Sequence, residues 1–208
     1  MKIVIFCIIT TMFFSGCASK RTFTQDEWTR ITTREYSGRS ATEVFDAIEK
    51  VLRLADESDV KIYRWPDRLI ATRSYLIYAV LAATNGLYTF DIHTVPGESG
   101  TKVVAIITLT AGTIAGAPTA YNPTIITTPS AGGMVMDNPE TYDLFFSRVK
   151  YFLNGGVWVT CERATEMYRD SPSGALDGLC LMSDDDLPEE MRQSTEGNNS
   201  WRSRRARR

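Results

Sequence analysis

Few side chains in this sequence could carry out acid–base or metal chemistry. His93 is the only histidine among 208 residues, and Asp91 lies two positions before it, so a strand would place both on one face. Such a pair could position an imidazole for proton transfer, but no nucleophile stands beside it and a structural role is the better interpretation. The three aspartates at 184–186 lack the spaced oxygen ligands and the glycine of a calcium loop. We therefore expect no catalytic residue, no metal site and no cofactor.

The first 17 residues have the layout of a secretory signal peptide. A single basic residue, Lys2, precedes an apolar stretch at 3–14, and the small residues Ser15 and Gly16 lead directly into Cys17. This apolar stretch is shorter than the roughly 20 residues that a membrane-spanning helix needs, which argues against an uncleaved anchor. A cysteine immediately after two small residues also distinguishes this site from an ordinary secretory cleavage site.

The sequence Phe14-Ser15-Gly16-Cys17 resembles the lipobox of bacterial lipoproteins, and the resemblance covers residues 1–17 only. It implies that residues 1–16 are removed and that Cys17 becomes the first residue of the mature protein, with a covalent lipid. Residues 17–27 would then form a lipidated tether to a membrane of the cell envelope. Ala18 stands where some lipoproteins have an aspartate that retains them at the inner membrane, which favours the outer membrane, facing the periplasm.

The remaining cysteines, Cys161 and Cys180, are suited to form a disulfide bond. Their spacing fits no compact zinc motif, and the only histidine is far away in the sequence. In an exported protein such a pair favours a disulfide over two free thiols. We expect this bond to hold the region after Gly156 against the rest of the domain.

The composition predicts one domain and argues against a nucleic-acid partner. The chain is 43% hydrophobic, which is enough to bury a core. It has 23 basic and 25 acidic residues, and five of the basic ones lie at 202–208, so the rest of the chain is clearly acidic. Residues 184–208 are acidic, then polar, then arginine-rich, and we expect them to be disordered. Residues 28–183 would form the single domain.

Two helices have clear start signals. Ser40 followed by Glu43 is a capping box, and apolar residues recur behind it at helical spacing. A second helix is expected from Pro139, with Asn138 before it and Gly155 at its end.

Five segments read as strands, mainly from β-propensity and turn signals. Their expected ranges are 28–36, 60–65, 69–75, 87–94 and 101–110. The second and third flank a Pro-Asp turn, and the fourth and fifth form a hairpin. We expect an α+β domain with an antiparallel sheet of four or five strands and both helices on one face.

Two long stretches, 74–90 and 103–136, contain no charged residue. If the segments 87–94 and 101–110 pair as a hairpin, both stretches emerge at its open end. They either extend the strands and close the core or form a docking surface, because large apolar patches usually mark interfaces. The candidate interface residues are Leu76, Ile77, Val80, Leu81, Ile114, Tyr121, Ile125, Ile126, Met134 and Met136.

These features favour a lipid-anchored protein of the cell envelope that acts as a non-catalytic binding or scaffold module. Its expected contacts are the membrane, through the lipid, and an envelope protein. The alternative is an envelope hydrolase, since carboxylate pairs are available throughout the chain, but nothing selects one pair.

The anchor can be tested directly. Because acylation requires the sulfur of Cys17, the variant Cys17→Ser should incorporate no radiolabelled palmitate and should remain unprocessed or soluble. The unchanged chain, labelled in parallel, should carry the label. Label retained by the Cys17→Ser protein would contradict the lipobox interpretation.

Overall fold

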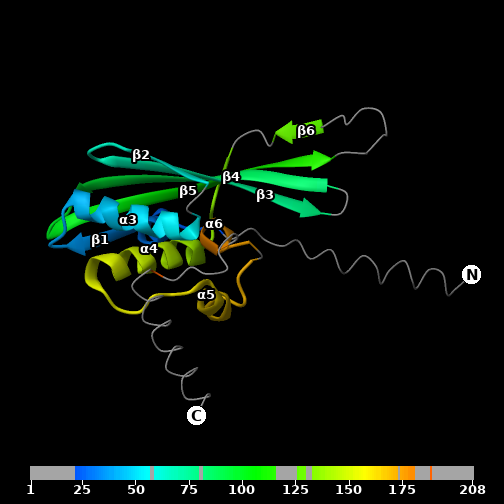
Figure 1. The fold of residues 1–208 in the computed structure, drawn as a ribbon. Helices are drawn as coiled ribbons and strands as arrows, with labels where there is room; N and C mark the ends of the chain where they lie inside the picture. The colour runs from blue at the N-terminus through cyan, green and yellow to red at the C-terminus, as the bar shows by residue number, and fades with distance from the viewer. Residues whose placement is uncertain are drawn as a thin grey trace, which may run out of the picture.

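The computed structural model describes residues 22–56, 59–79, 82–115, 126–129, 133–172, 174–180 and 188. The expected signal peptide 1–16, Cys17 and all of the tail 184–208 except Pro188 lie outside these residues. Figure 1 shows a long twisted sheet with the helices gathered on one of its faces.

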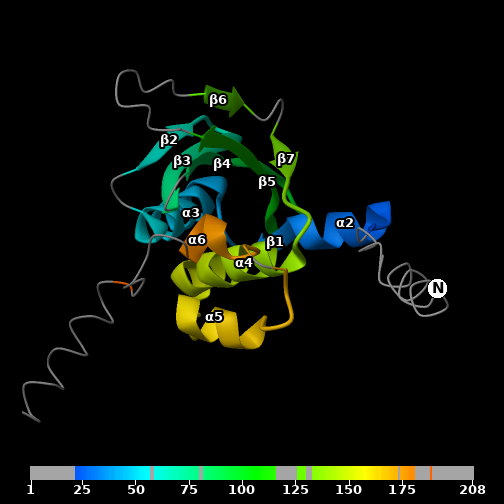
Figure 2. The ribbon, with the colours of Figure 1, turned by 90° about the vertical axis from the view of Figure 1, so that its right-hand side faces the viewer.

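The sheet is antiparallel and has the strand order β1-β5-β4-β3-β2. Its strands are β1 (Thr33–Ser37), β2 (Val60–Arg64), β3 (Arg68–Ala79), β4 (Ala82–Pro96) and β5 (Gly100–Ala115). Two short strands, β6 (Ile126–Pro129) and β7 (Met134–Val135), both pair with β5. Viewed from its end, the sheet curves around the helices (Figure 2). The expected α+β class and antiparallel sheet are confirmed.

Helix α3 (Ala41–Ala55) begins at the predicted capping box. The Ser40 hydroxyl accepts a hydrogen bond from the backbone N–H of Glu43, and the Glu43 carboxylate accepts one from the backbone N–H of Ser40 at 2.9 Å. One side of the helix is fully buried against the sheet and the neighbouring helix. The buried residues of α3 are Val44, Phe45, Ala47, Ile48, Val51, Leu52 and Ala55.

Helix α4 (Pro139–Asn154) packs beside α3 and is tied to β5 by a buried tyrosine. The Tyr142 hydroxyl donates to the carbonyl of Met136 at 3.1 Å and accepts the amide of Ile107 at 3.2 Å. Pro139 occupies the first turn, as predicted, and the helix ends at Gly155, whose φ of 72° suits glycine.

The prediction of a strand over 28–36 is wrong for the first half of that range. Residues Gln25–Thr32 form helix α2, and only Thr33–Ser37 form a strand. Thr24 and Glu27 make a second capping box, and the ring of Trp28 packs edge-on against Tyr142 with centroids 5.6 Å apart. Helix α2 also begins within the stretch that was expected to be a tether. A cap and one buried aromatic contact therefore prevail over β-propensity.

Both predicted strand pairs form antiparallel hairpins, and β3, β4 and β5 are longer than expected. Strand β2 pairs with β3, and β3 continues to Ala79. Strand β4 pairs with β5 in an unbroken register from Ala82↔Ala115 to Pro96↔Thr101.

The C-terminal region holds two short helices, α5 (Cys161–Met167) and α6 (Asp177–Cys180), joined by the predicted disulfide. The two sulfur atoms lie 2.12 Å apart and the Cα atoms 5.6 Å apart. The buried guanidinium of Arg148 lies over the ring of Trp158 at 4.8 Å. It donates to the carbonyl of Val159, near Cys161, at 3.1 Å and to that of Leu179, next to Cys180, at 3.5 Å. Residues from both sides of the bridge are thus held on α4.

Removal of the bridge should destabilise the domain. The double variant Cys161→Ala, Cys180→Ala should lose about 3 kcal/mol of unfolding free energy, because the open chain gains conformational entropy when unfolded. Thermal melts followed by circular dichroism measure the loss. Reductant should lower the melting temperature of the unchanged protein and leave that of the double variant unaltered. Equal sensitivity of both proteins to reductant would contradict this expectation.

Candidate interaction surface

The buried core stops partway along the sheet. The last strongly buried positions on the helix-covered face are Arg73 of β3 and Tyr88 of β4, which are cross-strand partners. Beyond that row, β3, β4 and β5 continue past the ends of the helices (Figure 1). We call this extension the arm. It comprises residues 74–79, 82–87, 110–115 and 126–129.

The arm exists because the strands are much longer than the helices that cover them. The β4–β5 ladder has a span of about 50 Å at 3.3–3.4 Å per residue. Helices α3 and α4 span only about 22–24 Å at 1.5 Å per residue. Two layers of such unequal length cannot cover each other completely. The part of the sheet that projects is also the part that has no charged residue in its sequence.

The arm is a regular four-stranded sheet in the order β3-β4-β5-β6. One cross-strand row runs through Leu76, Asn85, Gly112 and Pro129. Strand β2 begins at Val60, which pairs with Arg73, so the pairing of β2 with β3 does not reach residues 74–79. No described strand therefore pairs with these residues on the side away from β4. In the described chain, β6 likewise pairs only with β5.

The root of the arm is held by a buried ion pair and a pair of tyrosines. The Arg73 guanidinium is 3.3 Å from the Asp56 carboxylate and donates to the carbonyl of Gly178 at 2.8 Å. The rings of Tyr75 and Tyr88 lie with centroids 5.3 Å apart, and burial raises the pKa of both phenols. Both phenols are therefore neutral at physiological pH.

Of the predicted interface residues, some are exposed, one is buried in the core and four lie outside the described residues. Leu76 on the arm is 41% exposed and Met134 at its root is 68% exposed. Met136 is only 8% exposed, and its amide donates to the Ile107 carbonyl at 2.8 Å, so it belongs to the core. The backbones of Ile77, Ile114 and Ile126 lie in the strands of the arm, whereas Val80, Leu81, Tyr121 and Ile125 lie outside the described residues.

A second apolar site lies beside the root of the arm and was not foreseen. A cavity of about 410 Å³ is lined by Phe23, Trp28, Met134, Val135 and Asp137. It joins the start of α2 to strand β7. Sequence patterns could not predict that Trp28 and Val135 line one cavity, because the two residues are far apart in the sequence.

The pair Asp91 and His93 stands on the sheet face opposite to the helices. The Asp91 carboxylate accepts two hydrogen bonds from Arg68, at 2.9 and 2.8 Å, and lies 3.1 Å from the His93 imidazole. Chiefly the Arg68 hydrogen bonds hold the pKa of Asp91 below its usual value, so this carboxylate stays ionised as an ion-pair partner. Within the described ranges, no three His, Cys, Asp or Glu side chains are grouped to hold a metal ion.

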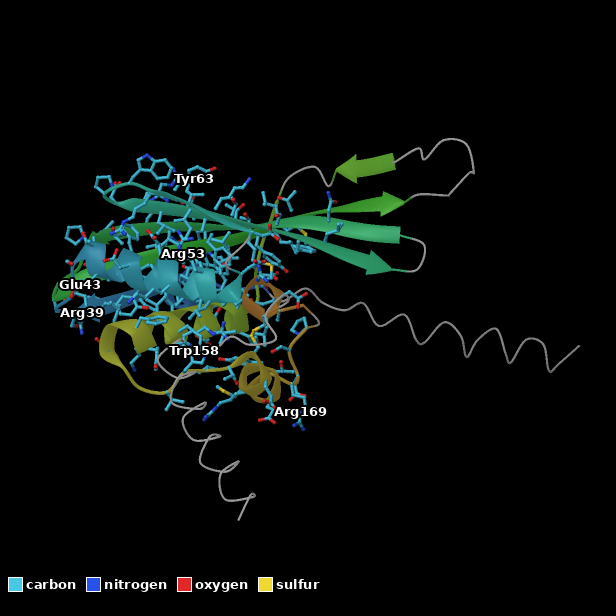
Figure 3. All side chains as sticks on the ribbon, in the orientation of Figure 1. Arg39, Glu43, Arg53, Tyr63, Trp158 and Arg169 are labelled. Atoms are coloured by element: carbon cyan, nitrogen blue, oxygen red, sulfur yellow. A yellow bond between two sulfur atoms is a disulfide. The ribbon has the colours of Figure 1, made fainter. Side chains whose placement is uncertain are left out.

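Charged side chains are plentiful elsewhere on the molecule. Figure 3 labels Arg39, Glu43 and Arg53 along the segment of α3 and Arg169 near α5, all on the helical part. Tyr63, 54% exposed, marks the opposite face of the sheet (Figure 3). The lack of charge is thus a local property of the arm and its flanking segments.

Comparisons with known proteins give no relative from which to transfer a function. No family model, curated protein or solved structure matches this chain. None of the helices in the described part of the chain is long and apolar enough to cross a membrane.

The root of the arm depends on the absence of a side chain at Gly86. A Cβ atom there would overlap the ring of its cross-strand partner Tyr75. Gly86→Ala should therefore push this ring away from Tyr88 and lower the free energy of unfolding by about 1 kcal/mol or more. The same substitution should cost much less in a Tyr75→Ala background. Denaturant titrations of the four proteins measure the difference, and equal costs in both backgrounds would contradict the assigned contact.

Proposed function

We propose that this protein is a lipid-anchored component of the cell envelope that binds a partner protein through the arm, without catalysing a reaction. The observation that carries the proposal is the projection of four strands, free of charged residues, beyond the helices of the domain. A domain that only needed a closed core would not require this length of sheet.

The chemistry of the arm suits burial against another protein. Charged residues are depleted at the centres of protein interfaces because desolvating an unpaired charge is costly. The arm offers the exposed side chains of Leu76 and Leu87 on the sheet face away from the helices, and backbone groups along its edges. These groups bind by shape, apolar contact and hydrogen bonding.

The first residues of the chain support a location at the membrane. The lipobox resemblance supports a lipid on Cys17 and attachment to the outer membrane, facing the periplasm. Between Cys17 and the first residue of α2, Gln25, lie seven residues, which span at most about 25 Å when extended. A domain tethered this closely would meet its partners at or near the membrane surface.

The proposal predicts that a charge on the arm abolishes partner binding while the domain stays folded. Leu76→Asp and Leu87→Asp change exposed residues outside the core, so melting temperatures should stay close to the unchanged protein. Co-purification from detergent-solubilised envelopes should show the loss of the partner, since the new carboxylate would be desolvated in the interface.

Val95→Asp provides the matched control. Val95 lies on β4, on the same face as Leu87 but at the other end of the strand, and is 44% exposed. This variant should keep the partner. Folded Leu76→Asp and Leu87→Asp proteins that retain every partner would overturn the proposed function, as would an equal loss of binding by Val95→Asp.

A further inference from the structure

A small apolar surface lies at the start of the described chain, beside strand β7. Phe23, Trp28, Met134 and Val135 line the cavity of about 410 Å³, together with Asp137. We call these four apolar residues the amino-terminal patch. Met134 is 68% exposed and Val135 is 48% exposed, so the patch is open to water in the domain by itself. Figure 2 shows α2 and β7 on the β1 side of the sheet, away from β2.

The amino-terminal patch is built on ordered elements. Strand β7, which carries Met134 and Val135, is paired with β5. The ring of Trp28 lies edge-on against the buried Tyr142, with centroids 5.6 Å apart, and the ring of Phe23 lies 6.2 Å from that of Trp28. A ligand that covered the patch would therefore need to order few side chains, which favours binding.

The position of the lipid-bearing cysteine indicates what covers this patch. Only five residues separate Cys17 from Phe23, and a chain of that length reaches at most about 22 Å when extended. A lipid on Cys17 would therefore hold the patch within this distance of the membrane surface. Such a short tether gives the membrane a high effective concentration around the patch, so even a weak contact would be formed most of the time.

The residue types of the patch suit a membrane surface. Tryptophan is enriched at the boundary between membrane and water because its ring is apolar and its N–H is polar. Phe23, Met134 and Val135 add apolar area, and contact with a membrane surface strengthens with the apolar area that it buries.

The charged residues near the patch are balanced in sign. Residues 20–30 together with Asp137 include three basic and three acidic side chains. These are Lys20, Arg21, Arg30, Asp26, Glu27 and Asp137. Attraction to anionic lipid headgroups would therefore contribute little, and the apolar side chains must provide the contact. Such a contact should form on an uncharged lipid surface and should persist in salt.

We propose that the amino-terminal patch docks against the phospholipid surface to which Cys17 is attached. The inference rests on the lipid anchor of the proposed function, and it does not depend on which partner the arm binds. The lipid provides the attachment and the patch fixes the orientation of the domain. Strand β7 pairs with residues 108 and 109, in the middle of β5, so the docked surface is a lateral side of the sheet. The arm then extends along the membrane (Figures 1 and 2).

Thiol labelling of the full-length lipoprotein tests this contact. The protein is purified from envelopes and inserted into preformed vesicles of uncharged phosphatidylcholine at a low ratio of protein to lipid. Met134→Cys places a thiol in the patch, and Tyr63→Cys places the matched thiol on β2, at the opposite edge of the sheet (Figure 3). Both positions are more than half exposed. With a lipid on Cys17 and a disulfide between Cys161 and Cys180, the introduced cysteine is the only free thiol of the mature protein.

Labelling of position 134 by a water-soluble maleimide should be slow in the vesicles. After division by the rate of the same variant unfolded in urea, it should be at least about ten times slower than at position 63, because a contact present roughly nine-tenths of the time leaves the thiol accessible only in the remainder. Without the contact, the exposed fractions predict the faster reaction at position 134.

A second measurement identifies what covers position 134. A fluorophore attached there in detergent, before insertion, should be quenched by lipids that carry a nitroxide on the acyl chain. The same fluorophore at position 63 should not be quenched. Both the slow labelling and the quenching should be equal at low and high salt.

Three results would overturn the inference. Equal labelling of the two positions, in protein that floats with the vesicles, would mean that the anchor stands while the patch remains in water. Slow labelling of position 134 without quenching would indicate that a protein surface, such as a second copy, covers the patch. Protein that does not float with the vesicles would contradict the anchor and this inference together. Loss of a partner by Leu76→Asp tests the arm separately and is unaffected by any of these results.

Discussion

The unbroken pairing of β4 with β5 is the constraint on which the rest of the structure depends. Fifteen residue pairs run from Ala82↔Ala115 to Pro96↔Thr101 without a bulge. Strands β1 and β3 add to the two sides of this hairpin, and the helices pack on the face that carries Phe90 and Ile107. A bulge would bend the strands and could fold their ends back over the core. Because the register continues instead, the excess length of the strands must leave the domain as an arm.

The root of the arm is fixed from the opposite end of the chain. Arg73, the last charged residue before the arm, is buried with Asp56 and donates to carbonyls of Asp177 and Gly178 in α6. Helix α6 ends at Cys180, which is bonded to Cys161. A buried guanidinium is tolerated only while its partners remain in place, because an uncompensated charge in the core costs several kcal/mol. The disulfide therefore acts on the arm indirectly, by holding two carbonyls that accept hydrogen bonds from Arg73.

Local signals predicted much of this fold and long-range contacts account for the rest. The capping box at Ser40 and the Pro139–Gly155 limits identified α3 and α4, and turn residues identified both hairpins. Helix α2 was missed although Thr24 and Glu27 repeat the same capping box, because the helix is short and its decisive contact, Trp28 on Tyr142, joins residues 114 positions apart. Met136 shows the complementary limit: an apolar residue in an uncharged segment is buried because of its link to Ile107. Whether an uncharged strand projects or closes a core depends on the length of the layer that covers it.

A partner held at the same membrane would be bound more tightly than the same partner in dilute solution. A lipid on Cys17 would confine the domain to a layer close to one membrane, with a tether of only seven residues before α2. Confinement raises the effective concentration of the arm around a partner in the same layer and removes orientations that cannot bind. Strands β1 and β2, the edges of the helix-covered part of the sheet, carry charged residues that discourage another chain from pairing with them. Binding would therefore be directed to the arm.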